Sequence, residues 1–353
     1  MKAVVLSGGE GSRLRPITHT NAKQLIPIAN KPILFHALEA IREAGIREVG
    51  IVVGHTEPEI RAAVGDGSTW DLEATFLPQA APLGIADGVR LAREFVGDEP
   101  FIVYLGDNVL LEGVGRFVRE FERHTPNAQI FLARVREPEH FGVATLEEDR
   151  VVRLVEKPRE FVSDLALVGV YLFDSSVFAA IEKLEPSWRN EYEITEAIQH
   201  LIDDGRTVRA EMVTGWWKDT GRPDDLLEAN RMMLAQLSPR IDGEVDGESR
   251  LEGTVVVEPG AKVIRSQIRG PAIIGEGTVV EDSMIGPHTS IYYGCTVSGG
   301  EVEDSIVMEQ CRIEGVRGLA GSILGRDVEV RRTDNGPARH SLIVGDQSQI
   351  HLS

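Results

Sequence analysis

The last third of the chain repeats itself, and this periodicity restricts the fold more than any other feature of the sequence. A serine that opens a short, largely aliphatic segment recurs at intervals of 17, 22, 17 and 19 residues. These serines are Ser266, Ser283, Ser305, Ser322 and Ser341. A period of about 18 residues corresponds to three hexapeptides, one for each side of a triangular coil. We therefore expect a left-handed parallel β-helix, with a glycine-rich β-sandwich as the alternative.

Composition marks where this coil begins. All four Trp and all eleven Phe residues precede Pro239, and the remainder is rich in Gly, Val, Ile and Glu. The sequence thus predicts a catalytic domain at residues 1–238 and the β-helix at residues 239–353. Coils of this kind stack flat faces and commonly associate side by side, so a homo-oligomer through the β-helix is expected. Because every chemical motif precedes Pro239, we expect the coil to serve assembly rather than chemistry.

The first part of the chain alternates strand-like and helix-like segments. Apolar runs at residues 3–6, 49–53, 74–77 and 101–105 read as buried strands, and helical patterns separate them. The first helix is expected to start at Asn30-Lys31-Pro32 and to end at Gly45. From Phe141 onward the strands look more antiparallel, as in an added substrate lobe. The pattern predicts an α/β domain, Rossmann-like, with a mixed, mostly parallel sheet and ligands at the carboxyl ends of its strands.

Overall composition restricts which binding partners and which cellular compartment are expected. The net charge of −19 argues against nucleic acid as a partner and requires any phosphate site to be locally basic or metal-assisted. No apolar run approaches the roughly 20 residues of a membrane span, and the N-terminus lacks the apolar core of a signal peptide. Two cysteines, Cys295 and Cys311, make no disulfide framework. A cytoplasmic protein with no membrane partner is expected.

A glycine-rich loop follows the first strand. Residues 6–16 read Leu-Ser-Gly-Gly-Glu-Gly-Ser-Arg-Leu-Arg-Pro, and glycines allow backbone N–H groups to approach an anion closely. Arg13 adds a forked cation for phosphate oxygens, and Lys23 follows further along. The segment has neither the Gly-Lys-Ser/Thr of a P-loop nor the third glycine and later acid of a dinucleotide fingerprint. The glycines alone would indicate an ordinary tight turn, but with the two cations they predict a clamp for a nucleoside triphosphate.

Two acids follow predicted strands elsewhere in the first part. Asp107 lies in Leu-Gly-Asp-Asn at residues 105–108, and Asp219 lies in Trp-Lys-Asp-Thr-Gly at residues 217–221. Each could be an ordinary turn aspartate. Carboxylates from distant strands can also share one Mg²⁺, which usually takes one or two carboxylates plus substrate phosphates. We therefore expect a magnesium site at Asp107 and Asp219.

Five short segments, in this order, resemble the sugar-phosphate nucleotidylyltransferases over essentially the whole chain. They are Gly-Gly-x-Gly-Ser-Arg-Leu at 8–14, Lys-Gln-Leu at 23–25, Gly-Asp-Asn at 106–108, Glu-Lys-Pro at 156–158 and Trp-x-Asp-Thr-Gly at 217–221. The resemblance is to the long form that carries a C-terminal β-helix and uses dTTP and glucose 1-phosphate. It implies in-line attack of the sugar phosphate on the α-phosphate, with Mg²⁺ as cofactor and pyrophosphate as leaving group.

The resemblance also implies roles for individual residues. The catalytic cations would be Arg13, Lys23 and Lys157, and the metal ligands would be Asp107 and Asp219. The nucleotide would contact Leu6, Gly8, Gly9, Gly11, Gln79, Gly84 and Asp107, with Gln79 and Gly84 reading the thymine. The sugar phosphate would contact Phe141, Gly142, Glu156, Lys157, Leu167 and Tyr171.

Two residues depart from the short thymidylyltransferases and keep alternatives open. Phe141 stands where those enzymes usually have Tyr, and Asp87 stands where they have Gln, which puts an acid near the nucleotide pocket. A sister enzyme that uses UTP or another sugar 1-phosphate is therefore one alternative. A second is a β-helix acyltransferase, for which His288 would be the catalytic candidate. A non-enzymatic paralogue is disfavoured by the intact set of cations and acids.

Overall fold

The computed structural model describes residues 1–148, 150–332 and 342–352, and their contacts divide the chain into two compact units. Unit 1 comprises Met1–Glu10 and Leu34–Asp219, and unit 2 comprises Gly11–Ile33 and Thr220–Ser353. This division differs from the boundary expected after Ser238, because contacts group the segment that follows the first glycines with the C-terminal coil. A functional boundary near Ser238 stays a prediction.

Unit 1 is built on a nine-stranded sheet. In spatial order its strands are β5 (Glu73–Pro78), β4 (Glu48–Val53), β1 (Lys2–Ser7), β6 (Phe101–Leu105), β11 (Leu165–Phe173), β8 (Ala128–Arg134), β12 (Val208–Met212), β10 (Arg150–Glu156) and β9 (Gly142–Glu147). The first four strands are parallel to one another, and β8 is parallel to β12. Strand β11 is antiparallel to β6 and β8, and β10 is antiparallel to β12 and β9. The expected α/β domain with a mixed sheet is confirmed.

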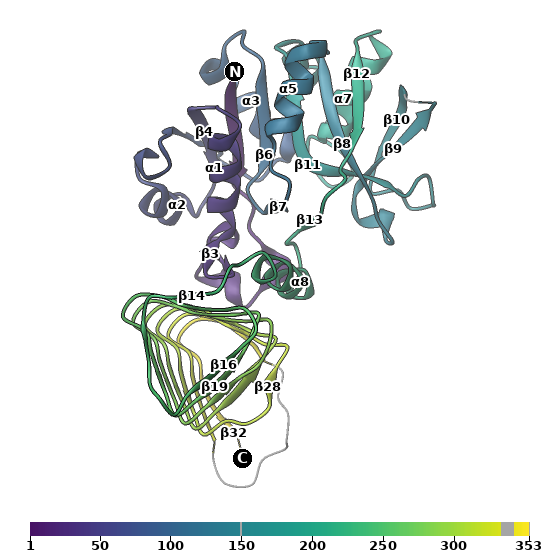
Figure 1. Cartoon of the computed structure of the whole chain (residues 1–353). Helices are drawn as coiled ribbons and strands as arrows, with labels where there is room; N and C mark the ends of the chain where they lie inside the picture. Colours follow the sequence, from purple (N-terminus) through teal and green to yellow (C-terminus); the bar gives the residue numbers. More distant parts are fainter. Residues whose placement is uncertain (149, 333–341, 353) are drawn as a thin grey trace. The chain divides into compact units, whose positions relative to one another are not determined.

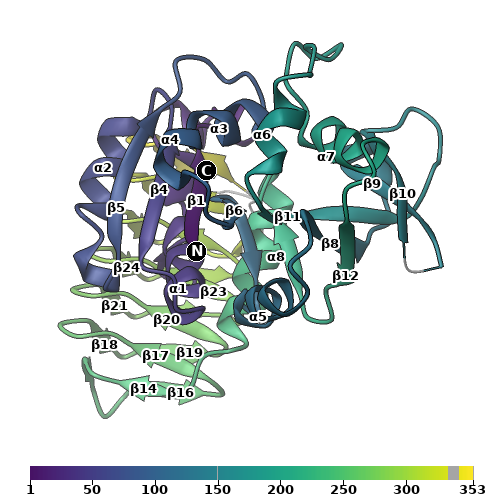
Figure 2. The same cartoon turned by 90° about the horizontal axis from the view of Figure 1, so that it is seen from above.

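Helices cover both faces of this sheet. Their bounds are α1 (Ile33–Glu43), α2 (Glu57–Val64), α3 (Ile85–Leu91), α4 (Arg93–Val96), α5 (Gly115–His124), α6 (Ser176–Ile181) and α7 (Ile194–Asp203). Figure 2 shows α3 and α6 on one face and α1 and α5 on the other. Val89, Phe178 and Ile198, from α3, α6 and α7, join one buried apolar cluster with Val103 of the sheet. Coverage on both faces explains why central strands such as β1 are continuous apolar runs.

Unit 2 is dominated by three stacks of short parallel strands that turn as a triangular coil (Figure 1). The first stack is β14 (Arg240–Ile241), β17 (Val255–Val257), β20 (Ala272–Ile274), β23 (Thr289–Ile291), β26 (Ile306–Val307), β29 (Ile323–Leu324) and β31 (Ile343–Val344). The second is β15 (Glu244–Val245), β18 (Lys262–Ile264), β21 (Val279–Glu281), β24 (Thr296–Ser298), β27 (Arg312–Glu314), β30 (Glu329–Arg332) and β32 (Gln349–Leu352). The third is β16 (Arg250–Glu252), β19 (Gln267–Arg269), β22 (Met284–Ile285), β25 (Glu301–Glu303) and β28 (Leu319–Ala320). These repeated parallel strands fit the predicted β-helix.

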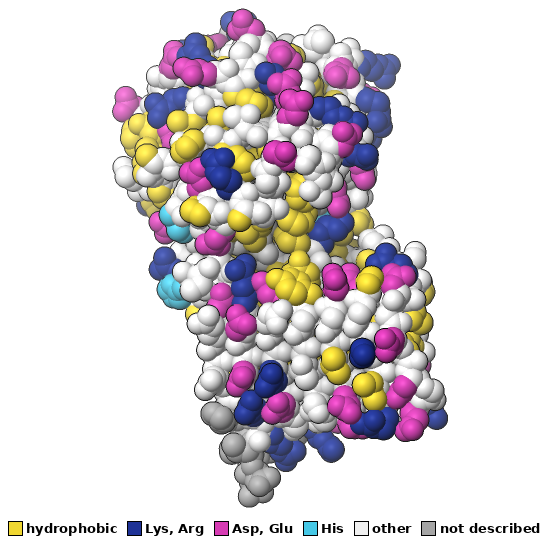
Figure 3. Space-filling view, turned by 90° about the vertical axis from the view of Figure 1, so that its left-hand side faces the viewer, with side chains coloured by type: hydrophobic (Ala, Val, Ile, Leu, Met, Phe, Trp, Pro, Cys, Tyr) yellow, Lys and Arg dark blue, Asp and Glu magenta, His cyan; other side chains and the backbone are white. Residues whose placement is uncertain are grey.

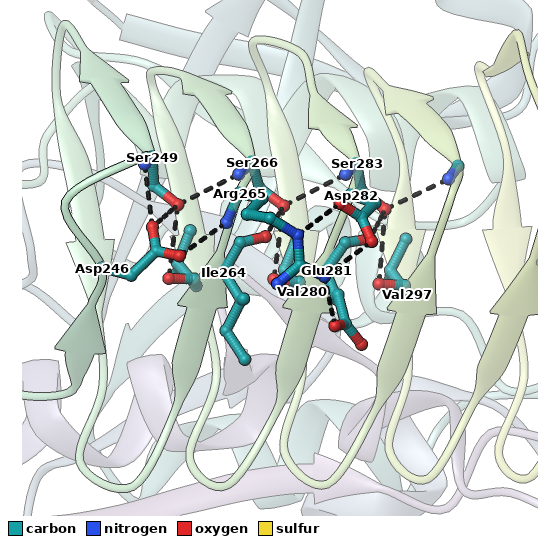
Figure 4. A network of polar contacts seen from close by, with 12 residues as sticks. Asp246, Ser249, Ile264, Arg265, Ser266, Val280, Glu281, Asp282, Ser283 and Val297 are labelled. Carbon is teal, nitrogen blue, oxygen red and sulfur yellow. Dashed lines mark hydrogen bonds and ion pairs between the residues drawn. The ribbon is translucent and has the colours of Figure 1, made fainter.

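The repeating serines form a hydrogen-bonded ladder at one corner of the coil (Figure 4). The backbone N–H of Ser266 donates to Ser249 Oγ over 3.0 Å, that of Ser283 to Ser266 Oγ over 3.1 Å, and that of Gly300 to Ser283 Oγ over 3.1 Å. The Ser266 hydroxyl donates in turn to the Ile264 carbonyl over 2.7 Å, and the Ser283 hydroxyl donates to the Glu281 carbonyl over 2.6 Å. Because each hydroxyl links one coil to the next, the sequence must repeat with the coil. Ser341 lies outside the described residues.

A hairpin and one helix fasten the N-terminal segment of unit 2 to the coil. Strands β2 (Pro27–Ile28) and β3 (Lys31–Pro32) flank Ala29 and Asn30, whose φ angles of 46° and 59° make a tight turn. Asn230 of α8 (Pro223–Leu234) accepts from the Ala29 N–H over 2.8 Å and donates to the His288 carbonyl over 3.1 Å. The first helix therefore begins at Ile33, after this hairpin, and the predicted start at Asn30 is wrong.

Charged side chains of both signs are interspersed over the exposed face of the coil (Figure 3). One example is Arg265, which pairs with Asp282 over 2.8 Å and also with Glu281. Exposed pairs of this kind contribute little stability. Within the described part of the chain, no helix is long and apolar enough to cross a membrane.

Candidate functional site

The ends of β1 and β5 bring two of the predicted nucleotide contacts together. Gln79 follows β5, and its N–H donates to the Val53 carbonyl at the end of β4 over 2.8 Å. Gly8 follows β1, and a Cβ atom there would lie only 2.8 Å from Gln79 Oε1. Leu6 is half-buried at the end of β1, and the exposed Gly9 has open space around its Cα. Gly8 and Gln79 therefore adjoin, as expected for loops at the carboxyl edge of a parallel sheet.

The loop before α3 is fixed by the segment before α7. Gly84 has a φ of 102°, and a Cβ there would lie 2.6 Å from the Tyr192 carbonyl oxygen. The Tyr192 N–H donates to the Leu83 carbonyl over 2.7 Å, and the Ala86 N–H donates to the Tyr192 carbonyl over 3.1 Å. Only glycine satisfies both the dihedral angle and the close approach. The predicted base-reading loop is thus joined to a segment more than 100 residues later.

One predicted metal ligand, Asp219, is the last residue of a strand, and the other, Asp107, directly precedes the strand paired with it. Strand β7 (Asn108–Leu110) pairs antiparallel with β13 (Trp217–Asp219), and Asp219 stands opposite Asn108. The buried Asn108 donates from Nδ2 to Asp107 Oδ1 over 2.9 Å and accepts from Trp217 Nε1 over 2.7 Å. The strand pairing therefore brings Asp107 and Asp219 together although the chain separates them widely.

The surroundings of Tyr171 support the same grouping of acids. Burial raises the pKa of the Tyr171 hydroxyl far above its ordinary value, and the charges of Glu156, Asp107 and Asp219 raise it further. Among the described residues, no cluster of three or more His, Cys, Asp or Glu side chains forms a complete protein metal site. Two carboxylates fit Mg²⁺, because this ion commonly completes its shell with water and substrate phosphates.

A second group of charges surrounds Glu156, at the end of β10. Glu156 Oε1 accepts from Arg189 Nη1 over 3.3 Å and lies 3.8 Å from Lys157 Nζ, and its other oxygen accepts from Thr195 Oγ1 over 3.2 Å. Arg189 also contacts Glu193 over 3.4 Å. Burial raises the pKa of the Glu156 carboxyl and Glu193 raises it further, while Lys157 and Arg189 act in the opposite direction.

The remaining predicted sugar contacts lie around this cluster or in the core. Gly142 stands opposite Glu156 in the strand pair, and a Cβ there would lie 2.9 Å from Glu156 Oε2. The Phe141 ring packs edge-on against Trp217, with 5.7 Å between centroids. Leu167 and Tyr171 are 5% and 3% exposed, so both side chains of β11 lie in the core of unit 1. A sugar-binding role for these residues stays a prediction.

Unit 2 carries three of the predicted phosphate-binding residues. Gly11 has a φ of 63°, and a Cβ there would lie 3.0 Å from Lys23 Cβ and 3.0 Å from Thr18 Cγ2. Thr18 Oγ1 donates to the Gly11 carbonyl over 2.7 Å. Arg13 lies in an exposed 3₁₀ turn, Ser12–Leu14, whereas Lys23 is buried in another, Lys23–Leu25. Gly11 and Lys23 therefore pack together within this unit.

The coil holds the segment that carries these cations. Thr20 Oγ1 donates to Asp346 Oδ2 over 2.8 Å, and Asn21 Nδ2 donates to both oxygens of the same carboxylate over 2.8 Å. Asp346 also accepts from the Arg326 N–H over 2.9 Å. An aspartate of the coil thus bonds two residues that lie between Arg13 and Lys23.

Sequence reasoning did not identify Arg189 as part of the site. The signal available was weak, since Arg189 merely precedes two acids, Glu191 and Glu193, before a helix. In the structure its guanidinium contacts both of them and Glu156. The Arg189 side chain is only 21% exposed. With Lys157, it adds positive charge where the sugar phosphate was expected.

Comparison with known proteins identifies the family. A family model described as nucleotidyl transferase matches residues 2–236. The chain belongs to the nucleotidyl transferase family. Two curated relatives are named glucose-1-phosphate thymidylyltransferase: one from Streptomyces antibioticus (50% identical over 354 residues, 100% of this chain and 99% of the relative) and one from Streptomyces griseus (52% identical over 354 residues, 100% of both).

A solved structure is also similar to this nucleotidyl transferase. It is a Bacillus anthracis protein in complex with sucrose, 34% identical, with a TM-score of 0.63 over 66% of this chain and 94% of that one. The matched residues 2–236 of the nucleotidyl transferase contain every predicted site residue. The Streptomyces relatives extend the likeness through the coil.

Proposed function

We propose that this nucleotidyl transferase is a glucose-1-phosphate thymidylyltransferase, which converts dTTP and glucose 1-phosphate to dTDP-glucose and pyrophosphate. The observation that carries the proposal is the identity of 50% and 52%, along the whole chain, to two Streptomyces enzymes of that name. Resemblance in the five short segments alone would not separate sugar or base preferences. Agreement along both units favours the long, coil-bearing form.

The reaction needs positioning and charge neutralisation more than acid–base catalysis. A phosphate oxygen of glucose 1-phosphate forms a bond to the α-phosphorus, and the bond from that phosphorus to the β-phosphate bridge oxygen breaks. The nucleophile is already ionised, so no general base is required. Arg13 and Lys23 bind the triphosphate and stabilise charge as it grows on the reacting phosphate. Lys157 and Arg189 bind the sugar phosphate.

The carboxyl of Glu156 has a separate role in this proposal. It lies between Lys157 and Arg189 and holds both cations by charge. Carboxylates bind sugar hydroxyls by accepting their hydrogens, so Glu156 takes a glucose hydroxyl beside the phosphate site. Gly142 leaves room for this carboxylate, because any side chain at that position would collide with it.

Asp107 and Asp219 would hold Mg²⁺. The support is the pairing of β7, which Asp107 directly precedes, with β13, which ends at Asp219, together with the acids gathered around Tyr171. When bound, the ion supplies positive charge to phosphate oxygens as negative charge develops on them. Asn108 orients Asp107 by donating to its Oδ1, and Trp217 orients Asn108.

The proposal extends to assembly and location. We infer that the coil is a left-handed β-helix and that the enzyme is a homo-oligomer joined through it, since stacked parallel strands leave broad flat faces for side-by-side association. A cytoplasmic location is supported by the two buried thiols, Cys295 and Cys311, which stay unbridged on neighbouring coils. Light scattering of the purified protein tests the oligomer.

An acyltransferase has less support. Its candidate, His288, lies in the coil, outside residues 2–236 that match the nucleotidyl transferase family. The deciding experiment measures pyrophosphate release for five nucleoside triphosphates against several sugar 1-phosphates, with the nucleotide sugar identified by mass. Turnover highest with dTTP and glucose 1-phosphate supports the proposal, and highest turnover with UTP or another sugar 1-phosphate refutes it.

A further inference from the structure

One buried carboxylate beside the base-reading loop has no role in the reaction described above. Asp87 lies in the first turn of α3 and is 3% exposed. Its Oδ2 accepts a hydrogen bond from Gln79 Nε2 over 2.8 Å, and its Oδ1 forms an ion pair with Arg90, one turn further along the helix. Gln79, the predicted base-reading residue, therefore contacts one carboxylate oxygen, and a cation contacts the other.

This contact fixes which way the Gln79 amide points. The oxygen and nitrogen of a side-chain amide have nearly the same shape, so the hydrogen bonds that they make decide which way the amide points. An ionised carboxylate accepts hydrogen bonds and donates none. The Gln79 nitrogen must therefore face Asp87, which leaves Oε1 turned toward Gly8, where a Cβ would approach it to 2.8 Å.

We propose that Asp87 is a positioning residue that sets base specificity by holding the Gln79 amide in one orientation. The proposal deepens the proposed function and rests on it. The Gln79 amide then offers its oxygen as an acceptor and its second N–H as a donor. Thymine and uracil match this pattern, since N3–H donates and the neighbouring carbonyl accepts. Cytosine does not, because its N3 accepts and its exocyclic amine donates.

The surroundings keep Asp87 in place. Arg90 also lies over the Tyr192 ring, 5.9 Å from its centroid, and Tyr192 is the residue whose backbone bonds the loop before α3. A buried, charge-paired acceptor on a helix is a rigid reference for the amide, whereas water would leave the amide free to turn.

The test compares dUTP with dCTP, which differ only in this hydrogen-bonding edge of the base. Asp87→Asn replaces the acceptor-only group with an amide that can donate to Gln79 Oε1, so the Gln79 amide can turn over. The ratio of kcat/KM for dUTP to that for dCTP is expected to fall at least about tenfold, the effect of one mismatched buried hydrogen bond. Asp87→Ala removes the acceptor at smaller size and gives the same test should the asparagine variant not fold.

Two controls separate positioning from general damage. Asp174 also accepts a hydrogen bond from a side-chain amide, that of Asn127, over 2.7 Å. It follows the antiparallel strand β11, so it lies near the start of β6, away from the carboxyl ends of the parallel strands. Asp174→Asn should leave the dUTP to dCTP ratio unchanged. In a Gln79→Ala background, Asp87→Asn should change the ratio no further, because Asp87 acts through Gln79.

The outcomes distinguish the inference from the proposed function. If the wild-type protein releases no pyrophosphate with dTTP or dUTP, the proposed function fails. If it does, but does not prefer dUTP over dCTP, or if Asp87→Asn keeps that preference, the inference alone is overturned. An effect of Asp87→Asn that persists without Gln79 would likewise overturn it, because the carboxylate would then act on the base directly.

Discussion

Replacing Asn230 tests whether the coil supports the chemistry as well as assembly. Asn230 is fully buried, and its amide bridges the Ala29 N–H and the His288 carbonyl. Around it, Ala29 packs with Leu234, Val256 and Ile273 in a small apolar cluster. Asn230→Ala leaves one backbone donor and one backbone acceptor buried without their partner.

The magnitude follows from counting those two groups. Leaving a buried polar group unpaired costs about 1–3 kcal/mol, so Asn230→Ala should lower the free energy of unfolding of unit 2 by roughly 2–6 kcal/mol. Asn30→Ala should cost less, because Asn30 is only partly buried, so water can replace the hydrogen bonds of its side chain, such as the one of 2.8 Å to the Ile291 carbonyl. We therefore predict a larger loss in the free energy of unfolding for Asn230→Ala than for Asn30→Ala.

Lys23 and the hairpin belong to the same unit, so the damage should reach the triphosphate site. We expect the KM for dTTP to rise more than the KM for glucose 1-phosphate, measured alongside denaturant unfolding. Asn127→Ala is the matched control, because Asn127 also bridges two groups, Asp174 over 2.7 Å and the Thr207 N–H over 3.0 Å, but within unit 1. A loss below about 0.5 kcal/mol with an unchanged KM for dTTP would refute the reasoning.

Three further predictions follow from the site. Asp107→Asn and Asp219→Asn should each lower kcat by roughly 10²–10³. The double variant should be little worse than either single variant, because both residues act on one ion. If the two effects on kcat multiply when activity is measured against Mg²⁺ concentration, a shared metal is contradicted. Arg189→Ala should raise the KM for glucose 1-phosphate about tenfold or more with little change for dTTP, since one charged hydrogen bond is lost; equal changes in both constants would argue against a sugar-phosphate role. The folded-state pKa of Glu156 is raised, so its contribution to stability is present at low pH and lost as pH rises through that value. Glu156→Gln should therefore gain thermal stability relative to the parent as the pH rises above the ordinary range of a glutamate carboxyl, while losing activity. A stability difference that does not depend on pH would contradict this reasoning.

The sequence by itself determined those features whose cause is local or periodic. The serine repeat is visible because each hydroxyl, as at Ser266 and Ser283, links adjacent coils, so the chemistry must recur once in every turn. The apolar runs of β1 and β6 are visible because strands buried on both faces contain few polar residues. Gly8, Gln79 and Asp107 could be placed at one edge because parallel strands all end there.

The tertiary structure alone decided the contacts between residues far apart in the chain. Nothing near Ala29 requires a positive φ. The turn forms because Asn230, 201 residues later, accepts its N–H, and this moves the start of α1 to Ile33. Arg189 joined the site for the same reason, since it lies in a turn while its carboxylate partner Glu156 comes from β10, 33 residues earlier. These interactions depend on burial and on geometry that folding creates, and a linear pattern carries no signal for either.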